Sequence, residues 1–91
     1  MTTQTHNPDE GSVSGLIERA GARHYSTTHV VQFFAYEHLR PDLAEVAKGF
    51  ADLMLALLTK LSDGPELTVA LRKLLDSREA ALRQALLDAG L

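Results

Sequence analysis

Large hydrophobic residues recur every three or four positions in the second half of the chain, which is the period of an α-helix. The pattern holds over residues 41–61 and again from residue 64 or 65 to about residue 89. The segment Ser62-Asp-Gly-Pro65 interrupts it with residues that favour turns. Two long helices separated by so short a break predict an antiparallel helical hairpin, and hence an all-α fold.

The expected helix ends carry residues that commonly begin or stop helices. Pro41 suits the first position of the first helix, where its missing N–H costs nothing. Asp63 is expected to cap the second helix, with Glu66 three residues later completing a capping box. Gly90 is expected to end the second helix, because glycine readily adopts the conformation found just after helices.

The first helix is expected to bury one broad apolar face against the second. At about 100° per residue, this stripe consists of Leu43, Val46, Ala47, Phe50, Leu53, Met54, Leu57, Leu58 and Leu61. A weaker strip of Ala44, Ala51 and Leu55 lies outside it, beside Lys48. We refer to these three residues as the Leu55 strip, and expect it to suit contact with another protomer.

The second helix has its own apolar stripe, which Arg78 interrupts near the middle. The stripe consists of Leu67, Leu71, Leu74, Leu75, Leu82, Ala85 and Leu86. The stem of Arg78 can lie along the apolar surface while its head reaches water. Alternatively, the cation is held at an interface for an anionic ligand. Because one hairpin cannot enclose its own core, a homo-oligomer is expected, most simply a dimer forming a four-helix bundle.

The N-terminal half is polar and is expected to hold little regular structure. Residues 1–28 are predicted to be a mostly flexible extension, with residues 1–14 disordered. Within it, residues 14–21 could form one or two helical turns, capped by Ser12 or Ser14. Residues 29–40 form an aromatic arm, in which the β-branched and aromatic residues 29–36 predict an extended conformation. Residues 41–91 form the hairpin.

Composition limits the class of partner. Twelve acidic residues against nine basic ones give a net charge of −3 at pH 7. A general DNA or RNA binder would need a basic surface, so no nucleic-acid polymer is expected as a partner, although a small anionic ligand needs only a few cations. The chain has no cysteine, which favours an intracellular protein. No apolar run approaches the length of about 18 residues that spans a membrane.

Catalytic and metal-binding patterns are not found in the sequence. The four histidines, His6, His24, His29 and His38, are spread over the N-terminal half, without the helical pairing that is typical of metal sites. No Ser, His and Asp arrangement suggests a nucleophilic triad, and the glycines fit no nucleotide-binding fingerprint. We therefore expect no enzyme, no metal and no cofactor.

Aromatic and cationic residues are the remaining candidates for function. Phe34, Tyr36, His38 and Arg40 directly precede the first long helix, and the cations along the two helices are Lys48, Arg72, Lys73, Arg78 and Arg83. Aromatic faces stack on nucleobases, and Arg or Lys binds phosphate. These residues therefore suit a ligand that carries bases and phosphates. The alternative is that both rings cap the core of the bundle.

The same residues carry a family resemblance. Three features occur in order: Phe34-Ala-Tyr36, then a helix opened by Pro41, then the turn and helix start Asp63-Gly-Pro-Glu66-Leu-Thr-Val-Ala70-Leu71-Arg-Lys-Leu74. Over residues 34–87 the chain resembles the helical-hairpin sponges of phage anti-CBASS proteins, to which a phage anti-Thoeris sponge is related. The chain differs from this pattern in its longer N-terminus, an arm that could cover or remodel the pocket.

The resemblance implies a helical homo-oligomer, commonly a hexamer, that sequesters bacterial immune second messengers in the cytoplasm of the infected host. In that family, cyclic dinucleotides bind in pockets shared by two protomers. By position, Tyr36 would stack on a base and Lys48 would contact phosphate. Cyclic trinucleotides bind at an oligomer axis, for which Arg78 is the first choice here and Arg83 the second.

Two functions of different class follow. The first is a non-catalytic sponge for cyclic dinucleotides or trinucleotides that antagonises anti-phage signalling. The second is a small structural or protein–protein interaction hairpin of phage or prophage origin, which would bind a host target through the Leu55 strip.

Overall fold

The N-terminal half of the chain folds into two short helices that the sequence pattern did not predict in full. The computed structural model describes residues 10–90. Helix α1 spans Val13–Ala20, and helix α2 spans Tyr25–Val31 and continues into a 3₁₀-helix, η1, over Gln32–Phe34. The extended conformation expected for residues 29–36 is therefore wrong for residues 29–34. No β-strand occurs in the described part of the chain.

Helical spacing explains why α2 and η1 replace the expected extended arm. Thr27, Val30, Val31 and Phe34 stand at positions i, i+3, i+4 and i+7, and all four are at most 1% exposed. Burial of this one face outweighs the preference of valine for extended structure, which is weak and depends on context. Because Thr27 is part of the buried face, the apolar pattern alone does not show the helix.

Helix α1 begins at a cap that the sequence offered as one of two choices. The Ser12 side chain accepts a hydrogen bond from the N–H of Gly15 at 3.0 Å, and Leu16 in the first turn is fully buried. Residues 13–20 and 25–28 are thus helical and packed, in contrast to the flexible extension predicted over residues 1–28. Residues 1–9, which the same prediction covers, lie outside the described residues.

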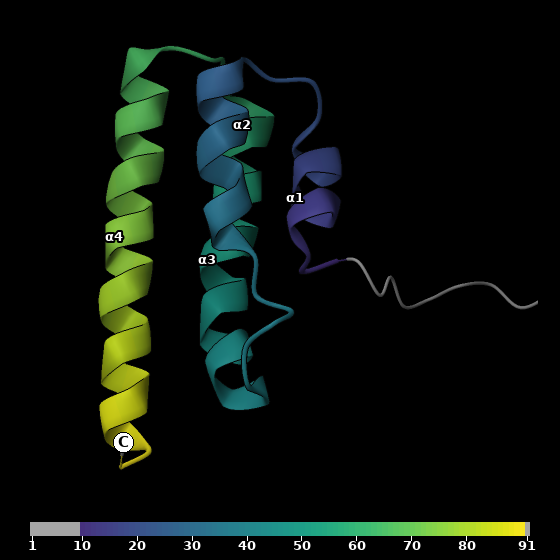
Figure 1. The fold of residues 1–91 in the computed structure, drawn as a ribbon. Helices are drawn as coiled ribbons and strands as arrows, with labels where there is room; N and C mark the ends of the chain where they lie inside the picture. The colour runs from purple at the N-terminus through teal and green to yellow at the C-terminus, as the bar shows by residue number, and fades with distance from the viewer. Residues whose placement is uncertain (1–9, 91) are drawn as a thin grey trace, which may run out of the picture.

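The two long helices lie where the hydrophobic pattern predicts them. Helix α3 spans Pro41–Lys60 and helix α4 spans Pro65–Asp88, each with proline in its first turn. They run in opposite directions in Figure 1. Gly90 follows α4 with φ of 86°, as expected for a glycine that ends a helix. The capping box is wrong: Gly64 is the N-cap of α4, no side chain caps it, and Asp63 bonds elsewhere.

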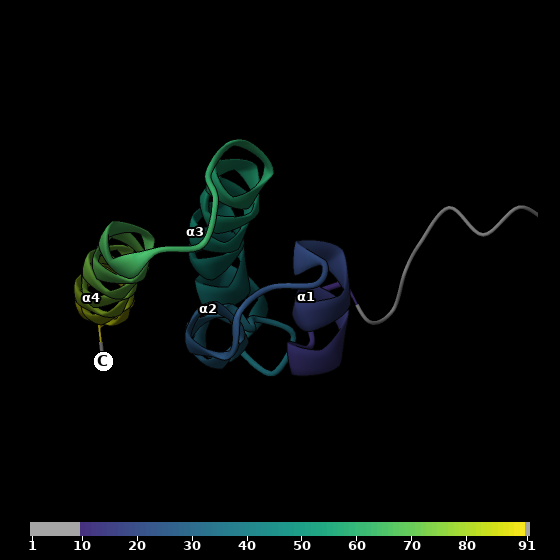
Figure 2. The same cartoon turned by 90° about the horizontal axis from the view of Figure 1, so that it is seen from above.

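All of the helices contribute to one core. Figures 1 and 2 place α2 between α1 and α4, and α3 and α4 pack on each other. The buried hydrophobic residues are Leu16, Val30, Val31, Phe34, Ala35, Tyr36, Ala47, Ala51, Met54, Leu58, Leu67 and Leu71. The N-terminal helices therefore cover apolar surface of α3 and α4 within the chain. The argument that one hairpin cannot enclose its own core thus holds for α3 and α4 alone, and the oligomer stays a prediction.

The buried face of α3 is turned from the predicted one. Ala51, from the Leu55 strip, is fully buried, and Leu55 packs against the core. Leu53 and Leu61, from the expected main stripe, are 48% and 44% exposed. The reason is that α1, η1 and α4 all pack on α3, so its buried surface includes the Leu55 strip.

None of the described helices has an apolar stretch long enough to cross a bilayer.

Candidate ligand-binding site

Both rings of the aromatic segment before α3, Phe34 and Tyr36, belong to the buried core. Phe34 ends η1 and is 0% exposed, so its ring packs in the core, as the core-packing alternative expects, and offers no surface to a ligand in this fold. Tyr36 lies two residues later and is 9% exposed. Tyr36 lies near the cationic side chains of Lys48 and Arg19, and it is therefore the ring around which a site can form.

Gly11 covers the ring of Tyr36. Its carbonyl oxygen accepts hydrogen bonds from the backbone N–H groups of Tyr36, at 2.8 Å, and Glu37, at 3.1 Å. A Cβ on Gly11 would lie 2.6–2.8 Å from three carbon atoms of the Tyr36 ring, closer than real Cβ contacts allow. This close approach requires glycine at position 11, and it ties the N-terminal segment to the aromatic segment.

The phenol of Tyr36 is buried among charged side chains. Its hydroxyl is buried and makes no hydrogen bond of good geometry within residues 10–90, although the Arg19 side chain lies close enough to interact with it. Burial raises the pKa of the phenol, and the negative charge of Glu10 raises it further, while Lys48 and Arg19 act in the opposite direction. A buried hydroxyl without a partner is a costly feature in a native fold. A ligand group could therefore pair with this hydroxyl only after the residues that cover it move aside.

Lys48 projects from α3 toward the same place. Its Nζ lies 2.8 Å from Oδ2 of Asp52, one turn further along the helix, and 3.9 Å from Oε2 of Glu10. The hydrogen bond to Asp52 raises the pKa of Lys48, and the nearby Tyr36 and Glu10 contribute to the same shift. The Lys48 side chain is 46% exposed, so its ammonium group remains accessible to an anion.

Arg78 on α4 binds the backbone of the aromatic segment. It lies on α4 in the middle of the apolar stripe, as predicted, but its head does not reach water. Nη2 donates a 2.7 Å hydrogen bond to the carbonyl of Ala35, and Nη1 donates a 2.6 Å bond to Glu79. Nε is buried without a partner in the described chain. The guanidinium thus holds the backbone directly after η1.

A groove of about 500 Å³ opens beside Arg78. His38, which is exposed, lies on its wall together with Ala35 and Glu79, and the remaining lining residues are Val13, Gln32, Phe33, Leu75 and Asp76. The groove brings two of the predicted site residues together, Arg78 and His38. The groove sets two carboxylates against one arginine. Near Lys48, two carboxylates are balanced by two cations, so the surroundings of Lys48 are more favourable to an anion.

Two further predicted residues join neither place. Arg40 is exposed just before α3, where its Nε and Nη2 donate to both carboxylate oxygens of Asp42, at 3.0 and 2.7 Å. This pairing raises the pKa of Arg40 and lowers that of Asp42. Arg83 is exposed on α4 beyond Arg78. Within residues 10–90, no hydrogen bond or ion pair connects either arginine to Tyr36, Lys48 or Arg78.

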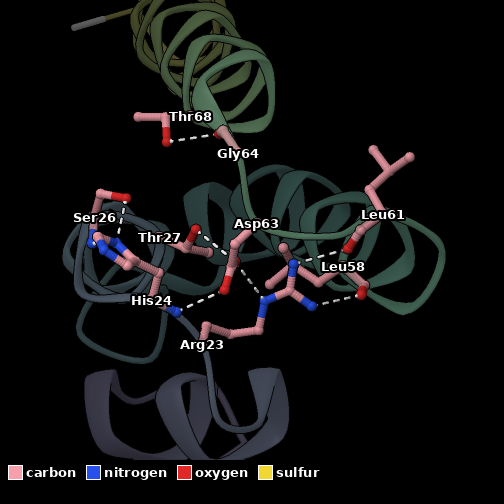
Figure 3. A network of polar contacts seen from close by, with 9 residues as sticks. All are labelled: Arg23, His24, Ser26, Thr27, Leu58, Leu61, Asp63, Gly64 and Thr68. Carbon is pink, nitrogen blue, oxygen red and sulfur yellow. Dashed lines mark hydrogen bonds and ion pairs between the residues drawn. The ribbon is translucent and has the colours of Figure 1, made fainter.

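A polar network that sequence analysis missed joins the N-terminal half to the α3–α4 connection (Figure 3). Asp63 accepts hydrogen bonds from Arg23 Nε, from the His24 N–H and from the Thr27 hydroxyl, at 2.7–3.0 Å. Arg23 also donates to the carbonyls of Leu58 and Leu61 near the end of α3. The network replaces the expected capping role of Asp63 and holds the α1–α2 junction in place.

Arg19 and Glu10 were also missed as neighbours of the candidate site. Arg19 Nη1 lies 3.9 Å from Oε2 of Glu10 and donates a 3.1 Å hydrogen bond to the Glu10 carbonyl. Glu10 and Arg19 come from the segment expected to be flexible, so no local pattern connects them to Tyr36 or Lys48. The candidate site thus contains the ring of Tyr36 and the two cations Arg19 and Lys48. Aromatic rings bind bases, and cations bind phosphates.

Comparisons with known proteins give no relative. No protein-family model matches the chain, and neither a curated protein nor a solved structure shows significant similarity to it.

Proposed function

We propose that this protein is a non-catalytic sponge that binds cyclic dinucleotides or trinucleotides in the cytoplasm of an infected bacterium and so antagonises anti-phage signalling. No bond is broken in this activity. Binding lowers the free concentration of the messenger below the level that its effector requires. The resemblance of residues 34–87 to the anti-CBASS sponges motivates the proposal, and the surroundings of Tyr36 support it.

The proximity of Tyr36 and Lys48 is the observation that carries the proposal. The resemblance assigns base stacking to Tyr36 and phosphate binding to Lys48, and the two residues come from different segments of the chain. Both border Glu10–Gly11, Tyr36 through the Gly11 contact and Lys48 through the Glu10 carboxylate. A ring and a cation in such proximity suit a nucleotide, whose base and phosphate are only a sugar apart.

The proposal includes a helical hairpin that assembles as a homo-oligomer, either a dimer or a hexamer, with ligand pockets shared between protomers. Exposed apolar side chains support assembly, since water-facing hydrophobic surface favours association. The large hydrophobic residues exposed by more than two fifths are Val13, Tyr25, Phe33, Leu53, Leu61, Val69 and Leu87. A trinucleotide would bind near Arg78, whose guanidinium would exchange Glu79 for phosphate.

Thermal denaturation with a panel of ligands tests the proposed function. The panel contains 3′,3′-cyclic GMP–AMP, cyclic tri-adenylate and their linear counterparts. A ligand at about 100 times its Kd stabilises a fold by about 2.7 kcal/mol, which raises the Tm of a domain this size by roughly 10 °C or more. We expect such a rise with one cyclic ligand and none with the linear ones. If no cyclic oligonucleotide binds in a calorimetric titration, the proposal is wrong.

One observation favours the second candidate, a protein–protein interaction module. Tyr25, His29 and Phe33 form a ladder of rings on the outer side of α2 and η1, with ring centroids 5.9 and 5.5 Å apart. Tyr25 is 76% exposed and Phe33 49%. Aromatic residues are enriched where proteins contact each other. This ladder, rather than the Leu55 strip, would then be the contact surface.

The two candidates predict different effects of one variant. Replacing Tyr25 and Phe33 together by serine removes the outer rings of the ladder and leaves Tyr36 and Lys48 intact. A sponge that binds its ligand at Tyr36 keeps its affinity for cyclic oligonucleotides in this variant. If the protein is an interaction module, the double variant loses its protein partner. In that case no ligand of the panel raises the Tm of the wild-type chain.

A further inference from the structure

Two cations of the candidate site converge on one carboxylate oxygen. Oε2 of Glu10 lies 3.9 Å from Nη1 of Arg19 and 3.9 Å from Nζ of Lys48. The three side chains are 35–46% exposed, so the group lies at the surface and is accessible from solvent. Carboxylate and phosphodiester oxygens are bound by the same charged donors. The carboxylate of Glu10 therefore stands where a phosphate of similar charge would be held.

The backbone next to Glu10 covers the ring beneath this charge cluster. Gly11 lies so close to Tyr36 that no side chain fits between them, and its carbonyl accepts two backbone hydrogen bonds from the aromatic segment. A base cannot stack on this side of the ring while Gly11 remains there. Residues 10–11 thus cover both parts of the candidate site, the ring through Gly11 and the cations through Glu10.

The structure leads to one inference, which rests on the proposed function. We propose that Arg19 of α1 binds a ligand phosphate together with Lys48, and that Glu10 is an internal competitor which the ligand displaces from these two cations. The site then extends beyond the segment that resembles known sponges, because Arg19 belongs to the N-terminal extension. Arg19 is a ligand-binding residue that neither the sequence pattern nor the resemblance identifies.

The geometry makes displacement of Glu10 feasible. Ion pairs between exposed side chains are weak, and both contacts to Glu10 are longer than the 2.8 Å contact between Lys48 and Asp52. A covering segment lowers the apparent affinity of a ligand by the fraction of molecules in which the site is open. Removing the charge of Glu10 therefore has a defined consequence: the affinity for an anionic ligand rises.

The first experiment measures this rise by calorimetric titration with 3′,3′-cyclic GMP–AMP at fixed ionic strength. The full-length Glu10→Gln variant is expected to bind about three- to tenfold more tightly than wild type, since it loses the competing charge and keeps a similar shape. Glu18→Gln is the matched control, because Glu18 is an exposed acid on α1. It changes the net charge equally and is expected to leave the affinity unchanged.

The second experiment isolates the contact of Arg19 with the ligand. Replacing Arg19 in wild type would also remove an ion-pair partner of Glu10 and so change its competition with the ligand. The substitution is therefore made in the Glu10→Gln background. Adding Arg19→Gln is expected to weaken binding about tenfold relative to Glu10→Gln alone, which corresponds to one lost charge-assisted phosphate contact. Arg72→Gln, at an exposed position of α4, is the control in the same background and is expected to have no effect.

The outcomes separate this inference from the proposed function. Tighter binding by Glu10→Gln alone, followed by a loss specific to Arg19→Gln, supports the inference. Equal affinities of wild type, Glu10→Gln and Glu18→Gln overturn it and leave the sponge function standing. An equal loss with Arg19→Gln and Arg72→Gln overturns the role of Arg19. If neither wild type nor Glu10→Gln binds a cyclic oligonucleotide, the proposed function and the inference both fail.

Discussion

Arg78 on α4 donates a 2.7 Å hydrogen bond from Nη2 to the backbone carbonyl of Ala35, so a buried cation of the last helix holds the end of η1. The same backbone continues directly to Tyr36. Arg78 interrupts the apolar stripe of α4, and its bond to Ala35 gives it a structural role there. Its contribution to stability and any contribution to ligand binding can be separated by experiment.

We expect Arg78→Met to lower the free energy of unfolding by about 2 kcal/mol or more, because a buried carbonyl loses its charged hydrogen-bond donor. Methionine keeps much of the apolar stem, so the loss reports mainly on the guanidinium. Arg83→Met, at an exposed position of the same helix, should stay within about 0.5 kcal/mol of wild type. Urea denaturation measures both. Equal stabilities of the two variants would show that the bond to Ala35 is dispensable.

Two glycine substitutions should have opposite effects. In Gly11→Ala the added Cβ meets the Tyr36 ring at 2.6 Å, and overpacking of this kind costs about 1–3 kcal/mol. In Gly49→Ala the Cβ meets nothing within 4 Å, and the residue lies inside α3. Alanine should stabilise that helix by about 0.5–1 kcal/mol. Thermal melts of the two variants compare them directly, and a Gly11→Ala protein as stable as wild type would contradict the close packing on Tyr36.

The network around Asp63 predicts a dependence of stability on pH. The His24 N–H, the Thr27 hydroxyl and Arg23 hold the pKa of Asp63 below its usual range. A carboxylate with a lowered pKa stabilises the fold above its unfolded-state pKa of about 3.9, and this stabilisation is lost as the pH falls through the folded-state pKa. Asp63→Asn should therefore be less stable than wild type at pH 7, and the difference should shrink below pH about 4.

Melting curves between pH 7 and pH 2.5 check this behaviour. Asp76→Asn, which removes an exposed carboxylate of α4, is the control and should follow wild type across the range. A difference between Asp63→Asn and wild type that stays constant down to the lowest pH would show that the charge of Asp63 is not what stabilises the network.

Lys48→Ala should weaken the binding of 3′,3′-cyclic GMP–AMP about tenfold or more, because a charge-assisted phosphate contact is lost. The Lys48 side chain is 46% exposed and its ion pairs are at the surface, so the Tm should hardly change. Tyr36→Ala is less informative, since its ring is buried and its removal should also destabilise the fold by more than about 2 kcal/mol. Lys60→Ala, at the exposed end of α3, is the control. If Lys60→Ala lost as much affinity as Lys48→Ala, the ligand would be held by nonspecific charge attraction.

The chain should assemble into two or more copies at micromolar concentration, because several large hydrophobic residues face water. Light scattering coupled to size exclusion should give at least twice the chain mass of 9.9 kDa. Leu53→Asp, at a 48% exposed position of α3, should lower the mass if this face is buried between copies. Ala56→Asp provides an exposed control on the same helix. A single-chain mass for wild type over this range would contradict both the oligomer and the shared pockets.

The sequence by itself determined α3, α4 and their ends. Their apolar residues repeat with the helical period, Pro41 and Pro65 stand in the first turns, and Gly90 follows the last one. These signals are local, since each depends on residues within a few positions of one another. The position of Arg78 within the stripe of α4 could be predicted for the same reason, but its partner Ala35 could not.

Only the tertiary structure decided how the N-terminal half folds and which residues it contacts. Helix α2 was hidden because Thr27 completes its buried face, and hydroxyl residues do not count as apolar in a pattern. The contact of Gly11 with Tyr36 and the approach of Glu10 to Lys48 join residues far apart in the chain. Packing free energy that depends on such distant pairs leaves no periodic signal in the sequence. The candidate residues Tyr36 and Lys48 could be named from the sequence, whereas the segment that covers them could be located only in the fold.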